Sequence, residues 1–190
     1  MDSMNSRLKR PVSRRTFIQW SASALFSGLI PFPVLASIPP LPSKSQTLSF
    51  YNIHTREVLT ACYRINGNLV PHALQQIDHI LRDHRTGEIK PIDTKLLDLL
   101  FRIINPVELK SPINVISGFR SAKTNAALRK RTSGVARKSL HMQGRAIDIR
   151  VPGLPTPAIR ERAIRFKSGG VGYYPKSDFV HLDTGRFRTW

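Results

Sequence analysis

The stretch of sequence that decides the fold runs from a loop into a strand and reads Ser139-Leu140-His141-Met142-Gln143-Gly144-Arg145-Ala146-Ile147-Asp148. Gly144 permits a tight bend there, because a residue without Cβ can adopt backbone angles that other residues avoid. Side chains alternate along the strand that follows, so Asp148 and Ile147 lie on opposite faces. Asp148 can therefore point back towards His141.

A second segment, Asp178-Phe179-Val180-His181-Leu182-Asp183, places another histidine and two carboxylates beside a second short strand. His181 and Asp183 are two residues apart and share a face of that strand. If the two strands are neighbours, His141, Asp148 and His181 supply three ligands for a zinc ion. Three protein ligands leave a fourth position open for water, which is typical of catalytic and not of structural zinc sites. Water bound there becomes a nucleophile near neutral pH.

At these residues the chain resembles the zinc D-Ala-D-Ala carboxypeptidase and dipeptidase family of metallopeptidases (M15), in its branch of exported murein endopeptidases with a twin-arginine signal. The family pattern Ser-x-His-x-x-Gly-x-Ala-x-Asp is met at 139–148, and the family's later zinc histidine matches His181. The resemblance spans roughly residues 47–190. It implies a Hedgehog/DD-peptidase-like fold and a zinc-dependent murein endopeptidase that hydrolyses peptide cross-links of peptidoglycan.

The resemblance also implies two catalytic residues. Asp178 lies three residues before the ligand histidine, where the family has a general base, and Arg120 lies in Ser117-Gly118-Phe119-Arg120-Ser121, which matches the family's substrate-positioning arginine. Peptide hydrolysis needs a base that takes a proton from water and passes it to the leaving amine. A fixed guanidinium can stabilise the negative charge that develops on the carbonyl oxygen. Asp183 is expected to hydrogen-bond a ligand histidine or a nearby amide and not to serve as a fourth ligand.

Two other functions remain as alternatives. One is a non-catalytic zinc-containing domain that binds the cell wall, against which Asp178 and Arg120 argue. The other is a DD-carboxypeptidase or dipeptidase, against which the resemblance to the endopeptidase branch argues. The residues leave open whether the bond cut joins D-Ala to diaminopimelate or two diaminopimelate residues. The Gly-x-Ser-x-Gly motif of many serine hydrolases and the His-Glu-x-x-His motif of common zinc proteases are both absent.

The amino-terminal residues 1–36 resemble a twin-arginine export signal. Arg14 and Arg15 precede a mostly apolar stretch and a plausible cleavage site. Pro31 and Pro33 interrupt the apolar stretch, which disfavours the alternative of a retained transmembrane anchor, since an anchor needs about 20 apolar residues. We therefore expect a periplasmic protein that meets the membrane only during export.

The composition favours a polyanionic partner, since 30 Lys and Arg residues stand against 12 Asp and Glu, a net charge of +18. Export and the lack of an aromatic-basic recognition pattern argue against nucleic acid. The expected partners are peptidoglycan stem peptides, and the expected state is a monomer. The single cysteine, Cys62, excludes an internal disulfide and a cysteine zinc knuckle, and its apolar surroundings predict a core position.

The domain is expected to cover residues 47–190, after a proline-containing linker at 37–46. Strands and helices alternate irregularly, which predicts the α+β class, with a small antiparallel or mixed sheet and flanking helices. The expected elements are a hairpin of strands 48–54 and 57–65 followed by an Asn66-Gly67 turn, helices at 71–87, 93–104 and 122–131, and strands at 113–116, 146–151, 172–174 and 179–182.

Overall fold

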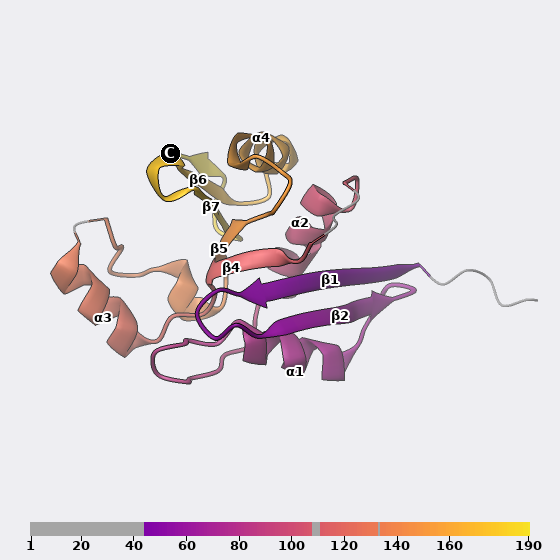
Figure 1. Cartoon of the computed structure of the whole chain (residues 1–190), viewed down its shortest axis with the longest axis horizontal. Coiled ribbons are helices and arrows are strands. Elements are labelled where there is room, and N and C mark those ends of the chain that lie inside the picture. The colour runs from indigo at the N-terminus through magenta and orange to yellow at the C-terminus, as the bar shows by residue number, and fades with distance from the viewer. Residues whose placement is uncertain (1–43, 108–110, 133) are drawn as a thin grey trace, which may run out of the picture. The chain divides into compact units, whose positions relative to one another are not determined.

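The computed structural model of the chain describes residues 44–107, 111–132 and 134–190 (Figure 1). The predicted export signal and the linker residues up to 43 lie outside the described residues. Among those described, no helix has the length and apolar character needed to cross a membrane. The first strand, β1 (Ser45–Asn52), begins two residues before the expected start of the domain at Thr47. Ser45 and Gln46 belong to it because they pair with Ile65 and Arg64 beyond a local register shift.

The strands of the described residues form one mixed sheet. After β1 they are β2 (Val58–Ile65), β3 (Asn68–Leu69), β4 (Ile113–Ser117), β5 (Ala146–Arg150), β6 (Gly170–Tyr174), β7 (Phe179–Asp183) and β8 (Arg188–Thr189). Their order in the sheet is β3-β2-β1-β4-β5-β7-β6-β8. Strand β1 is parallel to β4 and β6 is parallel to β8, whereas the other neighbours are antiparallel. The predicted α+β class is confirmed.

The predicted β1–β2 hairpin and the turn after it are present. Asn66 and Gly67 join β2 to β3 with φ angles of 49° and 84°, the left-handed backbone that a two-residue hairpin turn requires. Along β2, Ala61 and Tyr63 are buried in the core. Cys62 lies between them and is only half-buried. Its predicted core position is wrong, because the alternation of the strand turns its side chain to the other face.

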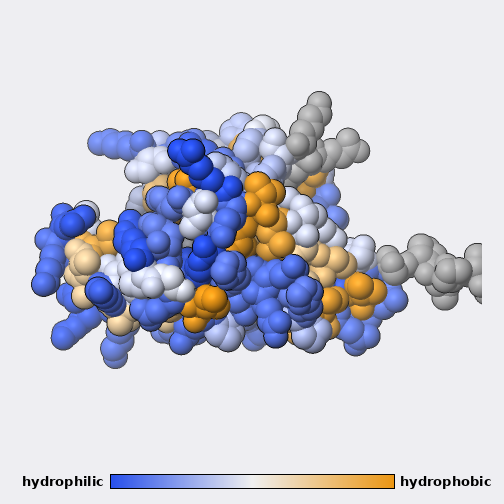
Figure 2. All heavy atoms as spheres, turned by 60° about the horizontal axis from the view of Figure 1, so that its bottom comes forward, coloured by the Kyte–Doolittle hydropathy of each residue, from blue (hydrophilic) through white to orange (hydrophobic). Residues whose placement is uncertain are grey.

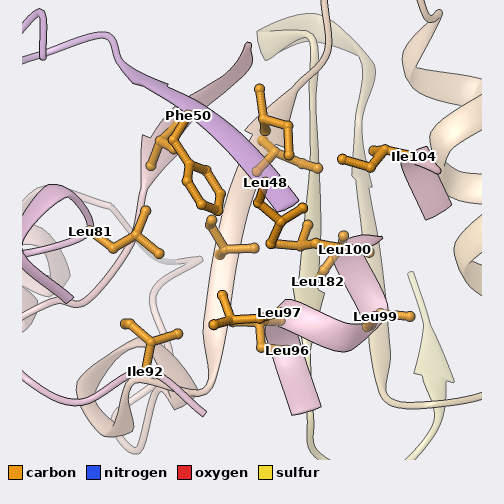
Figure 3. Packing of buried hydrophobic residues seen from close by; sticks show 14 of the residues in the cluster. Leu48, Phe50, Leu81, Ile92, Leu96, Leu97, Leu99, Leu100, Ile104 and Leu182 are labelled. Carbon is orange, nitrogen blue, oxygen red and sulfur yellow. The ribbon is translucent and has the colours of Figure 1, made fainter. Parts of the chain in front are cut away.

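Four helices accompany the sheet in the described part of the chain: α1 (Pro71–Ile80), α2 (Thr94–Ile104), α3 (Ala122–Arg131) and α4 (Thr156–Phe166). The predicted cap of α2 is present, since the Asp93 carboxylate accepts a hydrogen bond from the Lys95 amide at 3.0 Å. Leucines of α2 meet side chains of β1 and β7 in one hydrophobic core (Figure 3). This core joins the two halves of the sheet.

The core also fixes which strand faces carry polar side chains. Ile147 of β5 lies opposite Leu182 of β7, and both are fully buried. Because successive side chains point to opposite faces, Asp148 and His181 must face away from this core. Burial of one side chain on each strand therefore brings a carboxylate and an imidazole together on the other side.

Two helices differ from expectation. Helix α1 ends at Ile80, because Asp83 starts a turn in which its carbonyl accepts the Gly87 amide and its carboxylate accepts the Arg85 amide. Such local bonds from an aspartate compete with helix continuation. Helix α4 is present in the structure but is not among the helices that the sequence predicts. Pro155 and Pro157 give its start the composition of a loop, although proline is compatible with a first helical turn.

Candidate metal centre

His141, Asp148 and His181 reach one point from three elements. His141 lies on the short helix η1 (Leu140–Gln143), which Gly144 ends with a φ of 68°. A side chain at Gly144 would collide with the Pro91 carbonyl, so the bend needs glycine. Strands β5 and β7 are antiparallel neighbours in which Asp148 is directly opposite His181. The neighbouring strands on which the predicted ligand set depends are therefore present.

The three side chains are arranged as ligands of one ion. Asp148 Oδ1 lies 2.8 Å from His181 Nδ1 and 3.3 Å from His141 Nε2, and the two ring nitrogens are 3.2 Å apart. Donor atoms of a tetrahedral zinc ion, with bonds of about 2.0 Å, are roughly 3.3 Å from one another. One ligand atom from each residue lies within 4.8 Å of the other two. The donor set and its spacing fit a metal ion.

Hydrogen bonds behind the imidazoles fix which nitrogens face Asp148. The His141 Nδ1–H donates to the Gly118 carbonyl at 2.8 Å, since a carbonyl can only accept. The His181 Nε2–H donates to the Asp183 carboxylate at 3.1 Å, as expected for Asp183. Both rings thus direct their other nitrogen towards Asp148, where its lone pair can bind a metal ion in place of a proton. Partners of this kind orient metal-binding histidines and raise their basicity.

The electrostatics of the cluster favour a cation. Burial disfavours protonated His181, but hydrogen bonds to Asp148 and Asp183 outweigh burial and raise the pKa of His181 to about 9. Burial likewise opposes ionisation of Asp148, yet the neighbouring His141 and His181 hold the pKa of this carboxyl well below its usual range. The protein therefore stabilises two carboxylates and one positive charge at this position.

Arg120 lies against the cluster as predicted. It follows β4, and its side chain is 13% exposed, with Nη2 3.8 Å from Asp148 Oδ2. The same Nη2 donates to Ser117 Oγ at 3.4 Å, and the Arg120 amide donates to the His141 carbonyl. Burial lowers the pKa of Arg120 while Asp148 opposes that change. The guanidinium is thus fixed beside the triad.

Asp178 is placed differently from the other predicted residues. It has a left-handed backbone, φ 48°, after the short helix η2 (Pro175–Ser177). Its Oδ1 accepts a hydrogen bond from Thr156 Oγ1 at 3.0 Å, and its Oδ2 lies 3.6 Å from Arg150 Nη1. The side chain is 57% exposed. The next residue, Phe179, lines the pocket of the triad, whereas Asp178 does not.

The triad opens into a pocket of about 340 Å³, whose walls include residues without a predicted role. The Trp190 indole N–H donates to the Tyr174 hydroxyl at 2.9 Å, and the indole ring is 5.3 Å from the His181 ring. Tyr174 also stacks on Phe179. In the sequence, Gly172 is the residue that could have indicated this aromatic wall, because a side chain there would collide with the Trp190 indole.

Fold and site together define an α+β protein with an open pocket that ends in a cluster of two histidines and one aspartate able to hold a metal ion. The family model described as peptidoglycan L,D-endopeptidase MepK, a peptidase of the M15 group, matches residues 41–190. The chain belongs to this family.

Individual relatives agree with the family match. The peptidoglycan L,D-endopeptidase MepK of Escherichia coli strain K12 is 38% identical over 183 residues, 96% of this chain and 99% of the relative. The probable peptidoglycan L,D-endopeptidase MepK of Haemophilus influenzae is 37% identical over 179 residues, 94% of this chain and 95% of the relative. No solved structure matches the chain significantly. The predicted M15 family is confirmed, and the twin-arginine signal stays a prediction.

Proposed function

We propose that the protein is a zinc-dependent murein endopeptidase, with zinc bound by His141, Asp148 and His181. The observation that carries the proposal is the convergence of three donor atoms, 2.8 to 3.3 Å apart, at the base of an open pocket. The family match and the names of the relatives support peptidoglycan as the substrate. Those names further favour an L,D bond, such as that between two diaminopimelate residues. Peptidoglycan lies outside the cytoplasm, which supports a periplasmic location.

The metal site and the side chains of the pocket have separate roles in the proposed reaction. A bound zinc ion would supply a Lewis acid and lower the pKa of a water molecule at its open position. Arg120 is suited to orient the scissile carbonyl and to stabilise negative charge on its oxygen, because its planar guanidinium is already desolvated and fixed. Gly118 and Asp183 hold the two imidazoles.

Asp178 is our proposed general base. Its carboxylate has one hydrogen-bond donor, Thr156, and a distant Arg150, so rotation of the exposed side chain towards substrate breaks few contacts. Its neighbour Phe179 lines the pocket, which places the backbone of Asp178 beside the pocket. From there the carboxylate would take a proton from water and return it to the leaving amine.

The test is digestion of purified wall fragments, with products identified by mass. We expect about one zinc per chain and loss of cross-linked dimers that contain an L,D bond. A chelator should stop the reaction, and added zinc should restore it. His141→Ala should lose both metal and activity, whereas His72→Ala, on the exposed face of α1, should lose neither. Uncut cross-links with stoichiometric zinc would contradict the proposal, and release of terminal D-Ala alone would indicate a carboxypeptidase.

A further inference from the structure

One wall of the pocket continues into an exposed surface of six basic side chains, which we call the cationic surface. Its members are Lys123, Arg129, Lys130, Arg131, Arg137 and Lys138, all of them exposed. The sequence has no Asp or Glu from residue 121 to 147. No ion pair of the described residues includes any of the six. Their charges are therefore unpaired within the described domain.

Helix α3, which carries four of these residues, contributes little to the hydrophobic core. Its only buried residues are the polar Thr124 and Asn125. Polar bonds attach it: the Ser121 amide donates to the buried Asp83 carboxylate at 2.8 Å, and Asn125 Nδ2 donates to the Ala136 carbonyl at 3.2 Å. Figure 1 shows α3 at the end of the domain far from α4, and Figure 2 shows strongly hydrophilic side chains at that end. A helix without an apolar face presents its side chains to water or to a partner.

Helix stability does not account for the positions of these charges. The helix dipole favours cations in the last turn, which explains Arg129, Lys130 and Arg131. It disfavours Lys123 in the first turn, and it does not act on Arg137 or on Lys138 beyond the helix. Six like charges on one short segment also repel one another. A binding role explains all six positions, whereas the helix dipole explains three of them.

The cationic surface is continuous with the proposed catalytic pocket. Lys138, Ala136 and Thr132 line the same pocket as His141 and His181. A polymer whose scissile bond lies at the triad can therefore extend along this surface. Peptidoglycan stem peptides carry free carboxylates, and ammonium and guanidinium groups form charge-assisted hydrogen bonds with carboxylates.

We propose that the cationic surface binds the free carboxylates of uncut stem peptides next to the bond that is cut, and so holds the enzyme on its polymeric substrate. This inference rests on the proposed function for the identity of the polymer. Each exposed contact contributes little, but several together favour a polymer over a small fragment, because the fragment meets only the pocket. Salt should weaken the contacts by screening.

The test compares two variants that lose the same charge. In one, Lys123, Arg129, Lys130 and Arg131 of α3 become Gln, a good helix former. In the control, Lys90, Lys95, Arg165 and Lys167 become Gln; these are exposed, enter no ion pair of the described residues and do not line the pocket. Co-sedimentation with insoluble sacculi measures binding at low and at physiological salt. Hydrolysis of a short soluble cross-linked dimer measures the pocket.

We expect the α3 variant to bind sacculi on the order of tenfold less tightly at low salt and to cut the soluble dimer within about twofold of the parent rate. The control should bind like the parent, and amidation of the carboxylates of the sacculi should reproduce the loss. Equal loss in both variants, or none in the α3 variant, would overturn the proposal. The proposal would also be overturned if the α3 variant bound sacculi like the parent but lost binding to DNA or to anionic vesicles. Absence of hydrolysis by the parent bears on the proposed function alone, because sedimentation still measures the surface.

Discussion

Asp148 of the triad and two further aspartates, Asp183 and Asp178, differ in how freely they can move. Asp148 and Asp183 are buried and held by several partners; Asp183 accepts bonds from two backbone amides as well as from Arg188. Hydrogen bonds to the ionised form stabilise it, so burial does not stop these two residues from staying charged. Asp178 is exposed and accepts one hydrogen bond, from Thr156. A general base must gain and release a proton in every turnover, and Asp178 has the freedom to do so.

Replacement of Asp178 by Asn should separate chemistry from metal binding. The amide keeps the shape but accepts no proton, so turnover of cross-linked dimers should fall by a factor on the order of 10² or more. Zinc content should stay at the parent level, because Asp178 is not a proposed ligand. Glu161→Gln is the matched control, since Glu161 is an exposed carboxylate of α4 outside the pocket.

Thr156→Ala sharpens the same prediction. This variant removes the hydrogen bond that holds Asp178 while it keeps the carboxylate. Its turnover should equal or exceed that of the parent. Near-parental turnover by Asp178→Asn with full zinc would remove Asp178 from the mechanism.

Among the secondary-structure elements, β8 is only two residues long, yet it helps to shape the pocket. It pairs with β6, and the backbone of Trp190 bonds to Val171 and Tyr173. This pairing holds the indole against His181 and lets its N–H reach Tyr174. An indole can only donate, so the Tyr174 hydroxyl proton is directed elsewhere. Strand β8 thereby builds the aromatic wall of the pocket.

Gly172→Ala should displace that wall. The new methyl group would collide with the Trp190 indole, and the ring must move because the backbone of β6 is fixed by β7. Since the only other tryptophan is Trp20, fluorescence of protein lacking residues 1–36 reports on Trp190. We expect a red-shifted emission and weaker substrate binding, seen as a raised KM. Gly134→Ala is the control, because Gly134 lines the same pocket with open space around it; equal effects of both changes would contradict this account.

The contact between β2 and α2 predicts a loss of stability in alkali. The buried Tyr63 hydroxyl donates to Asp98 at 3.0 Å, and Arg64 pairs with the same carboxylate. Burial, and then the charge of Asp98, raise the pKa of Tyr63 far above its ordinary value. A pKa that is higher in the folded state than in the unfolded state adds to the free energy of unfolding. This contribution is present below the pKa of the unfolded state, near pH 10, and is lost as the pH rises above it.

Denaturant unfolding at several pH values checks this contact. Above about pH 10 the free energy of unfolding should fall by on the order of 1 kcal/mol per pH unit in the parent. Tyr63→Phe should be less stable at neutral pH but should show a smaller alkaline loss. Parallel pH profiles for parent and variant would show that Tyr63 is not the titrating group.

The elements that the sequence predicts are those whose signal is local. The Asn66-Gly67 turn, the Asp93 cap and the helix from 122 to 131 each depend on neighbouring residues, and each is present. The position of β8 and the contact of the Asp178 side chain with Thr156 depend on residues far apart in the chain. The periodicity of the sequence does not encode such contacts. The triad is an intermediate case: its ligand set follows from two motifs, but its assembly needs β5 beside β7, which the core enforces through Ile147 and Leu182.

At the scale of the whole molecule, most of the net charge lies in residues 37–190 and not in the predicted export signal. Removal of residues 1–36 takes away five basic residues and one acidic residue, which leaves 25 against 11, a net charge of +14. A charge of this size increases encounters with an anionic polymer through long-range attraction, which salt weakens. It would also promote contact with nucleic acid in the cytoplasm. The predicted export would thus separate the domain from this competing partner and bring it to its proposed substrate.

The predicted export by the twin-arginine route would depend on Arg14 and Arg15, which precede an apolar run that two prolines interrupt. With a reporter fused after Ala36, replacement of both arginines by lysine should keep the reporter in the cytoplasm, because the charge is unchanged and only the paired guanidinium groups are lost. The same exchange at Arg7 and Arg10 is the matched control, since it lies in the same basic region outside the pair, and it should leave export intact. A reporter that still reaches the periplasm with lysine at 14 and 15 would exclude this route, and loss of export in both variants would show that the pair has no special role.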